Sequence, residues 1–590
     1  MSLLELNLSS RTATNRRNSA RDFQCLLASR LRKLHSFAYG FTMAPTMIKK
    51  VLISLAGMGF WATSVLAADC ATYPIAPRTV NAPASEYAYS GRSSLDSEGI
   101  LVFDYGTAYN NLGKFRNPYF ISNYANALYR DYLESDCKNE YFKDLFLKQA
   151  DYLMQSADYD NGLALWRYPF HNDHFDLPPG WISGIAQARI ANVLLRAYGI
   201  TEIEDYKRAA EKGMGVYQNS LKDGGVITQD DETTWIEEAP RHDGRSYKIL
   251  NGHITALFGI IDYGQITGDP QWSELVRRAI LAVRRDLPLF DAGFTSYYSL
   301  DQPGPDRIIA PRSDYNALHV DQLLWLYDQT GDSWFLEWAS RFQAYETNGY
   351  KYTAKGSVDP IGHGPGQAAA WYYNAYWSHA DFPTWIEVGF SKPRLVKGFW
   401  IDGHGSKPSP RDFSVAAFVG DQWKTLEEVS GNGETRQVVH WKEPVVTEKI
   451  RLNIFSDNGN NNTALQAAVP ILSYPQYAAI TNSCNYRTNG RYHYNVNAAY
   501  DGDVESRMVV YCPGWIIFPN ENNHGKLSVK LQANPNSIVK VEYSMSFGNW
   551  RLVGKFTPRQ LDSIYIPSSR FLRLSFDKNI SSIAEITLMD

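Results

Sequence analysis

The chain has 590 residues, which at about 150 residues per domain leaves room for three or four domains. Charged residues make up 20% and hydrophobic residues 44% of the sequence, so a disordered or fibrous chain is excluded. The formal net charge of −4 gives no overall attraction for nucleic acid or for an anionic membrane surface, and we expect neither as a partner. An aromatic content of 14% favours sugars as ligands instead.

Residues 47–67 have the pattern of a signal peptide. Lys49 and Lys50 precede an apolar run over residues 51–66, and the small residues Ala67 and Ala68 follow it. The run is short for a permanent membrane-spanning helix, so we expect an exported, periplasmic or extracellular protein without stable membrane insertion. Residues 1–46 lie upstream of this signal, and we interpret them as a non-native or transit-like extension.

Export changes what the cysteines predict. Removal of Cys25 leaves an even number of cysteines in an oxidising compartment. Proximity in the sequence favours one disulfide between Cys484 and Cys512 and another between Cys70 and Cys137. No pair has the spacing of zinc ligands, and we expect no metal.

Residues 117–346 repeat one pattern, a long amphipathic helix, a polar break and a second helix, about every 65 residues. Helical hairpins of this kind bury their apolar faces only against one another, which predicts an (α/α) toroid or incomplete barrel over residues 68–355. Long polar and aromatic loops precede the inner helices, and we expect them all to open at one end of the toroid, as the site. The inner helices are expected to start near Asn117, Trp181, Leu250 and Tyr315.

The pattern changes after residue 355 to short alternating runs broken by Gly, Pro and Asn, which is typical of β-strands. Two blocks are visible, at 366–475 and 480–590, and each predicts an all-β jelly-roll sandwich domain. The segments "SFGNWRLV" and "RFLRLSF" resemble discoidin-like (coagulation factor 5/8 type C) domains of the kind attached to carbohydrate-active enzymes. Glycan binding and a purely structural role both remain open for these domains.

Four motifs of the helical region are similar in order and spacing to the C-terminal domain of the D-glucuronyl C5-epimerase family. They are "PPGWISGIAQARIANVLLRAYGIT", "WIEEAP" followed by "ILNGHITALFGIIDY", "LPLFDAGFTSYYSL", and "APRSDYNALHVDQL". The resemblance covers about residues 95–345. It implies a helical barrel that converts D-glucuronate to L-iduronate residues in a heparosan- or heparan-like polymer, without a dissociable cofactor and with an acidic polysaccharide as the partner.

Epimerisation at carbon 5 removes a proton α to a carboxylate, so it needs an acid/base group on each face of the sugar and donors at the developing charge. The resemblance implies that Tyr315 is one catalytic acid/base, that Tyr298 lies nearby, and that Glu238 serves the other face. Residues expected to hold the substrate carboxylate or the Tyr315 hydroxyl are Arg312, Asn251 and His319.

Purely structural roles remain open for several of these residues. Asn251 opens a predicted helix, where a capping role is a rival interpretation. His319 lies one helical turn after Tyr315. Its alternative role is that of a buried histidine whose hydrogen bonds are satisfied within the protein. Asp314 beside Arg312 has the alternative of a local ion pair.

The chain departs from the family at Ala239, where a tyrosine commonly follows the acidic pair. Either Glu238 alone serves as the base, or His242 or Tyr247 reaches in from the loop, or the reaction is a related one. A polysaccharide lyase shares the same carbanion. An (α/α) glycoside hydrolase would need two opposed carboxylates, for which Glu238 and Asp314 are the available pair. A non-catalytic glycan-binding protein is the third alternative, and a homodimer is compatible with all of them.

Basic residues cluster in the loops that are expected to form the mouth of the toroid. We expect Arg241 and Arg245 to bind the polymer in a basic cleft, and Trp181 to contact the sugar. Further basic residues of these loops are His171, His174, His242, Lys248 and Arg307.

Overall fold

The computed structural model describes most of the chain from residue 73 onward. The described ranges are 73–75, 82–89, 91–301, 308–347, 350–358, 362–369, 375–404, 410–459, 462–473, 475–482, 499, 508–509, 513–520, 525–576 and 580–589. The predicted extension and signal peptide at 1–67 lie outside these ranges. Within the ranges, no helix combines the length and the apolar character that a membrane crossing requires.

The chain divides into two compact units. The first comprises Met1–Asp286 with Thr488–Gly490, and the second comprises Leu287–Arg487 with Arg491–Asp590. The division falls inside the predicted helical domain, and the predicted domain boundaries at 355, 366, 475 and 480 stay predictions.

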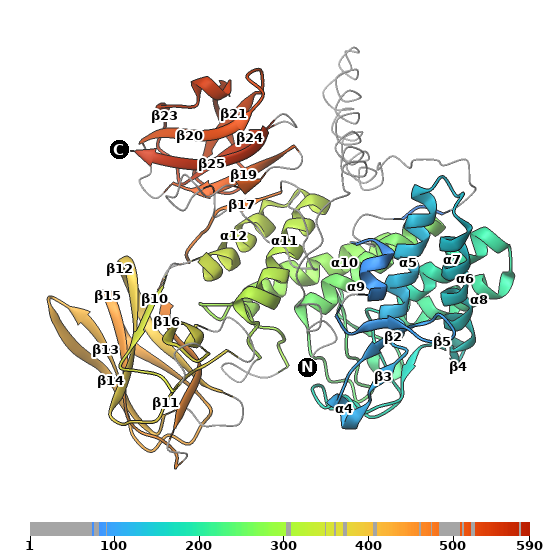
Figure 1. Ribbon diagram of the computed structural model, residues 1–590, viewed down its shortest axis with the longest axis horizontal. Helices are drawn as coiled ribbons and strands as arrows, with labels where there is room; N and C mark the ends of the chain where they lie inside the picture. Colours follow the sequence, from blue (N-terminus) through green and yellow to red (C-terminus); the bar gives the residue numbers. More distant parts are fainter. Residues whose placement is uncertain are drawn as a thin grey trace. The chain divides into compact units, whose positions relative to one another are not determined.

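The described part of the first unit contains three helical hairpins, and the first helices of neighbouring hairpins pack side by side: α5 on α7 and α7 on α9 (Figure 1). A short helix, α3, packs on α5. The helices are α3 (Ala84–Tyr89), α5 (Pro118–Glu134), α6 (Glu140–Gln155), α7 (Gln187–Thr201), α8 (Glu204–Met214), α9 (Leu250–Thr267) and α10 (Pro270–Asp286).

Helix α5 begins where the sequence predicts. The Asn117 side chain accepts hydrogen bonds from the backbone N–H groups of Tyr119 and Phe120, and Pro118 occupies the first helical position. The predicted helix start at Trp181 is wrong. Trp181–Ile182 is strand β7, paired with β6 (Arg167–Tyr168), so α7 begins only at Gln187.

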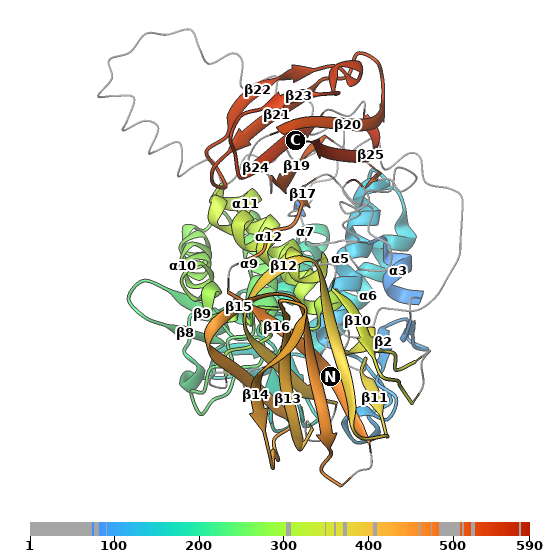
Figure 2. The ribbon, with the colours of Figure 1, turned by 90° about the vertical axis from the view of Figure 1, so that its left-hand side faces the viewer.

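Short strands fill the segments before the hairpins. In Figures 1 and 2 they lie together at the lower end of the helices of this unit, as the prediction of loops opening at one end requires. Besides β6 and β7 they are β1 (Ser93–Leu95), β2 (Leu101–Asp104), β3 (Lys114–Phe115), β4 (Asp158–Asp160), β5 (Leu163–Leu165), β8 (Ile227–Gln229) and β9 (Thr234–Ile236), with the short helix α4 (Ala108–Asn111).

The second unit begins with a further helical hairpin and continues in strands. A one-turn π-helix, Arg312–Asn316, leads into α11 (Ala317–Thr330), which pairs with α12 (Ser333–Thr347). The predicted succession of helices and then strands is confirmed. A closed toroid stays a prediction, because it would have to include both compact units.

The first group of strands forms one antiparallel sheet in the order β11-β16-β12-β15-β13-β14, with β10 paired to β12. Both halves of β12 contribute to a single core, since Ile386, Val388, Phe399 and Ile401 belong to the same buried cluster. The strands are β10 (Lys351–Ala354), β11 (Trp377–His379), β12 (Thr384–Gly403), β13 (Asp412–Val419), β14 (Gln422–Val429), β15 (Arg436–Ser456) and β16 (Thr463–Leu472).

The second group forms two antiparallel sheets, β17-β19-β24-β21-β22 and β18-β25-β20-β23, whose side chains share one core. This is the arrangement of a β-sandwich. The strands are β17 (Ile480–Thr481), β18 (Met508–Val509), β19 (Gly514–Pro519), β20 (Gly525–Ala533), β21 (Val539–Ser544), β22 (Arg551–Phe556), β23 (Ile564–Ile566), β24 (Phe571–Phe576) and β25 (Ile580–Met589).

The disulfide predictions fall largely outside the described residues. Cys137 lies in the turn after α5 and is disulfide-bonded. The cysteines at 25, 70, 484 and 512 are not among the described residues, so both pairings stay predictions.

A buried ion pair joins the three first helices of the first unit. The Arg196 guanidinium of α7 donates to Asp262 Oδ1 of α9 at 2.7 Å and to Asn126 Oδ1 of α5 at 2.8 Å. Both charged side chains have 0% exposure. Removing one member of such a pair leaves a buried charge without its compensation.

We expect Arg196→Met to lower the free energy of unfolding by about 3–5 kcal/mol, because the Asp262 carboxylate stays buried without the guanidinium. Urea unfolding of the full chain measures it. Arg208→Met is the matched control, since Arg208 on α8 is 65% exposed and pairs with Asp205 at the surface. Adding Asp262→Leu to Arg196→Met should recover part of the loss. Equal effects of the two single substitutions would contradict a structural role for the pair.

Candidate functional site

Glu238 lies where the starts of α7 and α9 meet. Its backbone carbonyl accepts a hydrogen bond from the N–H of Gly184, just before α7, at 3.0 Å. Its side chain lies against Gly252 in the first turn of α9, so closely that a Cβ at position 252 would stand 2.2 Å from Glu238 Oε2. A side chain at 252 would therefore displace the carboxylate.

The Glu238 carboxyl group is poised to exchange a proton near neutral pH. It is 3% exposed, and Oε2 has no hydrogen-bond partner among the described residues. Burial raises the pKa of Glu238 to about 7, and no compensating hydrogen bond contributes. A buried carboxyl with a pKa near the working pH is what a general acid/base requires.

The neighbouring Glu237 has a structural environment. Its carboxylate accepts hydrogen bonds from the Ser246 hydroxyl and from the backbone N–H groups of Tyr247 and Lys248, the latter two at 3.2 and 3.1 Å. Burial raises the pKa of Glu237 to about 7 as well, although these donors work in the opposite direction. Glu237 thus holds the 246–248 loop, and of the acidic pair it is Glu238 that keeps an oxygen available.

Other buried polar groups stand at the starts of the same helices. Gln187, the first residue of α7, and Ser183 are fully buried, and their side-chain polar atoms have no hydrogen-bond partners in the part of the chain described. Asn251 is also fully buried, in the first turn of α9; the helix is capped at Ile249 without a side-chain bond, so the capping alternative for Asn251 is wrong. Buried polar atoms are normally satisfied, which points to a ligand or ordered water here.

The sequence analysis missed Ser183 and Gln187. Both lie within the quoted motif "WISGIAQ", but a serine and a glutamine in a helical pattern carry no chemical signature of their own. Only their complete burial distinguishes them from ordinary surface residues.

An aromatic cluster lies at the start of α5. Tyr168 is fully buried, stacks on Trp181 with ring centroids 4.0 Å apart, and donates its hydroxyl hydrogen to Asn117 Oδ1 at 3.2 Å. Burial is the main cause that raises the pKa of Tyr168, and the charge of Glu238 adds to it. Tyr168 is a site residue that the sequence analysis did not single out, because it is one of 38 tyrosines.

Trp181 is largely buried, and it is among the residues that line the cavity described below. It is 5% exposed, and its indole N–H donates to the backbone carbonyl of Phe170 at 2.9 Å. The stacked pair therefore fixes the Tyr168 ring. Direct contact of Trp181 with substrate stays a prediction.

Tyr247 and His242, the two residues expected to replace the missing tyrosine at 239, both make hydrogen bonds within the loops. The Tyr247 hydroxyl donates to the backbone carbonyl of Phe175, and His242 Nδ1 bonds the carbonyl of Leu221 at 2.9 Å. Ala239 itself is 1% exposed. All three alternatives for this position stay predictions.

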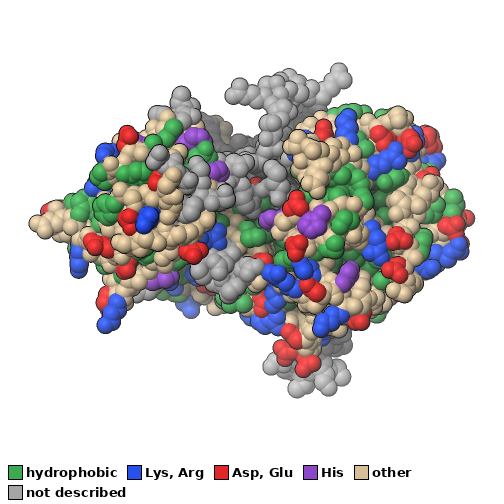
Figure 3. Space-filling view, turned by 90° about the horizontal axis from the view of Figure 1, so that it is seen from below, with side chains coloured by type: hydrophobic (Ala, Val, Ile, Leu, Met, Phe, Trp, Pro, Cys, Tyr) green, Lys and Arg blue, Asp and Glu red, His purple; other side chains and the backbone are tan. Residues whose placement is uncertain are grey.

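The loop cations of this unit are matched by carboxylates. Arg241 donates a hydrogen bond to Asp243 at 2.9 Å and pairs with Asp176 at 3.4 Å, and the bond to the Asp243 carboxylate raises the pKa of Arg241. His171 pairs with Asp173 at 2.8 Å. Arg245 lies over the Tyr247 ring at 5.4 Å. On the face drawn in Figure 3, Lys and Arg side chains are interspersed with Asp and Glu.

A cavity of about 560 Å³ opens among these loops. Its charged lining includes Asp158, Asp176 and Asp243 beside Arg167, Arg241 and His242. The lining is mixed in sign, so attraction of a polyanion here would require the polymer to displace the local carboxylates. The basic cleft stays a prediction.

The second unit holds the predicted tyrosine pair. Tyr298 and Tyr315 are 0% and 1% exposed, and their rings meet edge to face with centroids 4.9 Å apart. Tyr315 lies in the π-helix before α11, and such turns are frequent at functional sites. The side chain of Arg312, in the same turn, is outside the described part of the structure.

His319 is held on one side of its ring. Its Nδ1 bonds the Ser296 hydroxyl at 2.7 Å, while Nε2 is buried and has no hydrogen-bond partner among the described residues. Burial lowers the pKa of His319 to about 3, so the imidazole is neutral at physiological pH. The residue is thus only half satisfied as an inner histidine.

In the described residues, no group of three or more His, Cys, Asp or Glu side chains is arranged to hold a metal ion.

Residues 160–344 match the sequence model of the family described as D-glucuronyl C5-epimerase C-terminus. This confirms the resemblance inferred from the four motifs. A D-glucuronyl C5-epimerase of Caenorhabditis elegans is 28% identical over 226 residues, which cover 35% of this chain and 36% of that protein. The chain thus spans about a third of the length of that relative. An uncharacterized protein of Methanocaldococcus jannaschii is 28% identical over 267 residues, covering 42% of this chain and 84% of that protein.

Solved structures similar to about a fifth of the chain are carbohydrate-binding modules. The family 32 module of C. perfringens NanJ, in complex with galactose, has a TM-score of 0.19 and 15% identity, covering 20% of this chain and 92% of the module. A pectin-binding module has a TM-score of 0.18 and 22% identity, covering 21% of this chain and 91% of the module. These scores carry no argument about function.

The raised pKa of Glu238 predicts a pH-dependent stability difference. The carboxyl titrates near 4.5 when unfolded and near 7 when folded, so between these values the folded state holds a proton that unfolding releases. Wild-type stability should therefore fall as pH rises through this window, by up to about 1.4 kcal/mol per pH unit from this group. Glu238→Gln removes this loss. The free energy of unfolding of the variant should therefore rise relative to that of wild type from pH 5 to pH 7, and the difference should stay constant above pH 7.

Urea unfolding at pH 5, 6, 7 and 8 measures the difference in the free energy of unfolding. Glu237 is present in both proteins, so its own titration cancels in this difference. Glu274→Gln is the control, because Glu274 pairs with Arg277 on the exposed side of α10. A stability difference for Glu238→Gln that is constant across this range would show that the carboxyl titrates normally.

Proposed function

We propose that the protein is a polysaccharide uronate 5-epimerase that converts D-glucuronate to L-iduronate residues in a heparosan- or heparan-like polymer. The observation that carries the proposal is the buried Glu238, with a pKa near 7 and an unpartnered oxygen, within the segment that matches the epimerase family. The nematode relative is a D-glucuronyl C5-epimerase, which is consistent with the proposal.

The reaction needs two proton transfers at one carbon. Glu238 would remove the proton from carbon 5, and the electron pair left behind would delocalise into the sugar carboxylate as an enolate-like dianion. The Tyr315 hydroxyl would then deliver a proton to the opposite face, which inverts the centre. Return of a proton to Tyr315 and loss of one from Glu238 through solvent restore the enzyme, so no cofactor is consumed.

The proposal requires Glu238 and Tyr315 to stand on opposite faces of one sugar ring. Tyr298, edge to face with Tyr315, would orient that ring. His319, neutral at physiological pH, and Asn251 would donate hydrogen bonds to the carboxylate, with Arg312 as the cation. The starts of α7 and α9 beside Glu238 add positive helix-dipole ends, which favour an anionic substrate.

A lyase would begin with the same proton abstraction and then expel the group at carbon 4. Product chemistry on a glucuronate polymer separates the alternatives: unsaturated uronate indicates a lyase, new reducing ends a hydrolase, and solvent deuterium at carbon 5 without cleavage an epimerase. Export to the periplasm or outside the cell, where such polymers occur, is part of the proposal.

We expect Tyr315→Phe to reduce deuterium incorporation at carbon 5 by about 10²- to 10⁴-fold, because a general acid/base loses its proton while the ring stays in place. Nuclear magnetic resonance of the polymer in deuterated buffer measures the exchange. Tyr327→Phe is the matched control, since Tyr327 lies on α11 and is only partly buried. More than about a tenth of wild-type exchange in Tyr315→Phe would remove Tyr315 from the mechanism.

We expect Glu238→Gln to slow deuterium exchange that starts from glucuronate and exchange that starts from iduronate to different extents. If Glu238 and Tyr315 serve different faces, exchange that starts from glucuronate and exchange that starts from iduronate each depend on a different first base. The variant should slow one of them more. Equal slowing would indicate that Glu238 holds the substrate rather than transferring the proton.

A further inference from the structure

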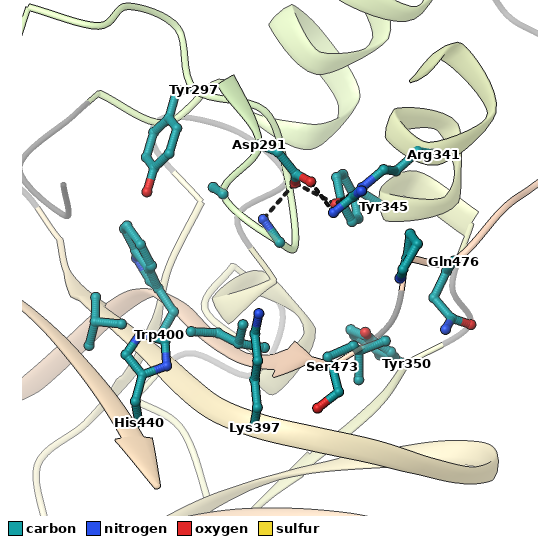
Figure 4. A pocket seen from close by; sticks show the side chains of 16 residues that line it. Asp291, Tyr297, Arg341, Tyr345, Tyr350, Lys397, Trp400, His440, Ser473 and Gln476 are labelled. Carbon is teal, nitrogen blue, oxygen red and sulfur yellow. Dashed lines mark hydrogen bonds and ion pairs between the residues drawn. The ribbon is translucent and has the colours of Figure 1, made fainter. Parts of the chain in front are cut away.

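A second cavity lies within the second unit, and Tyr298, Tyr315 and His319 are not among the residues that line it. It has a volume of about 220 Å³ and lies between the loop after residue 290, helix α12 and the strands β12, β15 and β16 (Figure 4). The residues that carry the argument are Asp291, Arg341, Lys397, Trp400, His440 and Ser473.

A β-bulge turns Lys397 into this cavity. Val396 pairs with Leu472 and Gly398 pairs with Ile471, so Lys397 is an extra residue between consecutive partners. Val396 and Phe399 both belong to the core of the sheet, so the bulge places Lys397 on the outer side together with Trp400. Bulges commonly re-aim side chains next to binding sites. In Figure 4 the Lys397 ammonium group points towards the loop that carries Asp291.

The cavity keeps a positive charge that no neighbour neutralises. Asp291 pairs with Arg341 and also accepts hydrogen bonds from the Tyr345 hydroxyl at 2.5 Å and the Gly293 N–H at 2.8 Å. Lys397 is exposed and has no ion pair with any described residue. An anionic group in the cavity would meet an unpaired ammonium and find the one nearby carboxylate already satisfied.

Two buried hydrogen-bonding groups of the lining are also unused. Trp400 is 3% exposed, and its indole N–H has no hydrogen-bond partner among the described residues. The same holds for the buried hydroxyl of Ser473, at the end of β16. Such groups are normally satisfied, so their convergence on a polar cavity indicates a ligand with several acceptors.

The aromatic side chains of the lining and the volume of the cavity limit the chemical class and the size of the ligand. The Trp400 indole and the Tyr297 ring, with centroids 6.2 Å apart, supply apolar faces of the kind on which sugar rings pack. The volume is below the roughly 300–1,000 Å³ of sites for drug-sized ligands, so one sugar ring fits rather than a chain segment.

We propose that this cavity is a carbohydrate-binding subsite that takes one acidic sugar unit, with its carboxylate or sulfate on Lys397 and its hydroxyls on the Trp400 N–H and Ser473. Neither Glu238 nor Tyr315 lines this cavity. It would hold a polymer chain at a second point and so raise the local concentration of substrate.

Isothermal titration calorimetry on the full chain tests the proposal without turnover, and so remains informative if the chain exchanges no deuterium. The probes are an unsulfated glucuronate-containing tetrasaccharide, a neutral tetrasaccharide of N-acetylglucosamine, an N-acetylglucosamine tetrasaccharide carrying sulfate esters, and free sodium sulfate. Binding of the glucuronate probe identifies the carboxylate as the anchor, and binding of only the sulfated probe identifies the sulfate.

Lys397→Ala should remove one of the acidic tetrasaccharides bound per chain, or weaken its binding about tenfold or more. Ser473→Ala, a small change that leaves the ammonium in place, should weaken the same binding event. Lys424→Ala is the matched control, because Lys424 is exposed on β14 of the same sheet and does not line the cavity.

Three results would overturn the proposal: equal binding by Lys397→Ala and Lys424→Ala, no binding of any acidic probe, or displacement of the sugar by free sulfate with no preference for the saccharide. The last would make the cavity a simple anion site. Unchanged thermal unfolding of Lys397→Ala confirms that a loss of binding is not a loss of fold.

Discussion

The buried ion pair of Arg196 and Asp262 is the constraint on which the helical unit depends. Because a guanidinium without its carboxylate is costly in an apolar interior, α7 and α9 must keep the register that brings the two together. The additional bond to Asn126 holds α5 to the same point. Three hairpins far apart in sequence are thereby fixed side by side, and so are their starts.

The site follows from those fixed starts. Glu238 touches the backbone before α7 and the first turn of α9, and its charge contributes to the raised pKa of Tyr168, which bonds Asn117 at the start of α5. Gly252 allows the carboxylate to approach the helix backbone so closely. The resulting burial, rather than any charged neighbour, sets the proton affinity of Glu238. A shift between α7 and α9 would admit water and return this carboxyl to ordinary behaviour.

In the β-rich part, a β-bulge rather than burial positions a charged side chain. A single inserted residue in β12 turns Lys397 to the outer side of the sheet, beside Trp400. In the helical unit the charge is buried and loses its solvent, whereas here it stays exposed and without a counter-ion. The first arrangement suits proton transfer and the second suits binding.

The sequence by itself determined the order of helices and strands and the family resemblance, and it supplied Glu238, Tyr298 and Tyr315 as candidates, because periodicity and motif spacing are local properties. It misplaced the start of α7, where pairing of Trp181 with Tyr168 overrides the helical pattern. Only the tertiary structure decided which acid of the pair keeps an available oxygen, that Ser183 and Gln187 are buried with unsatisfied polar atoms, and that Lys397 faces a cavity. Desolvation and unsatisfied hydrogen bonds depend on neighbours brought together from distant parts of the chain, and no local pattern records them.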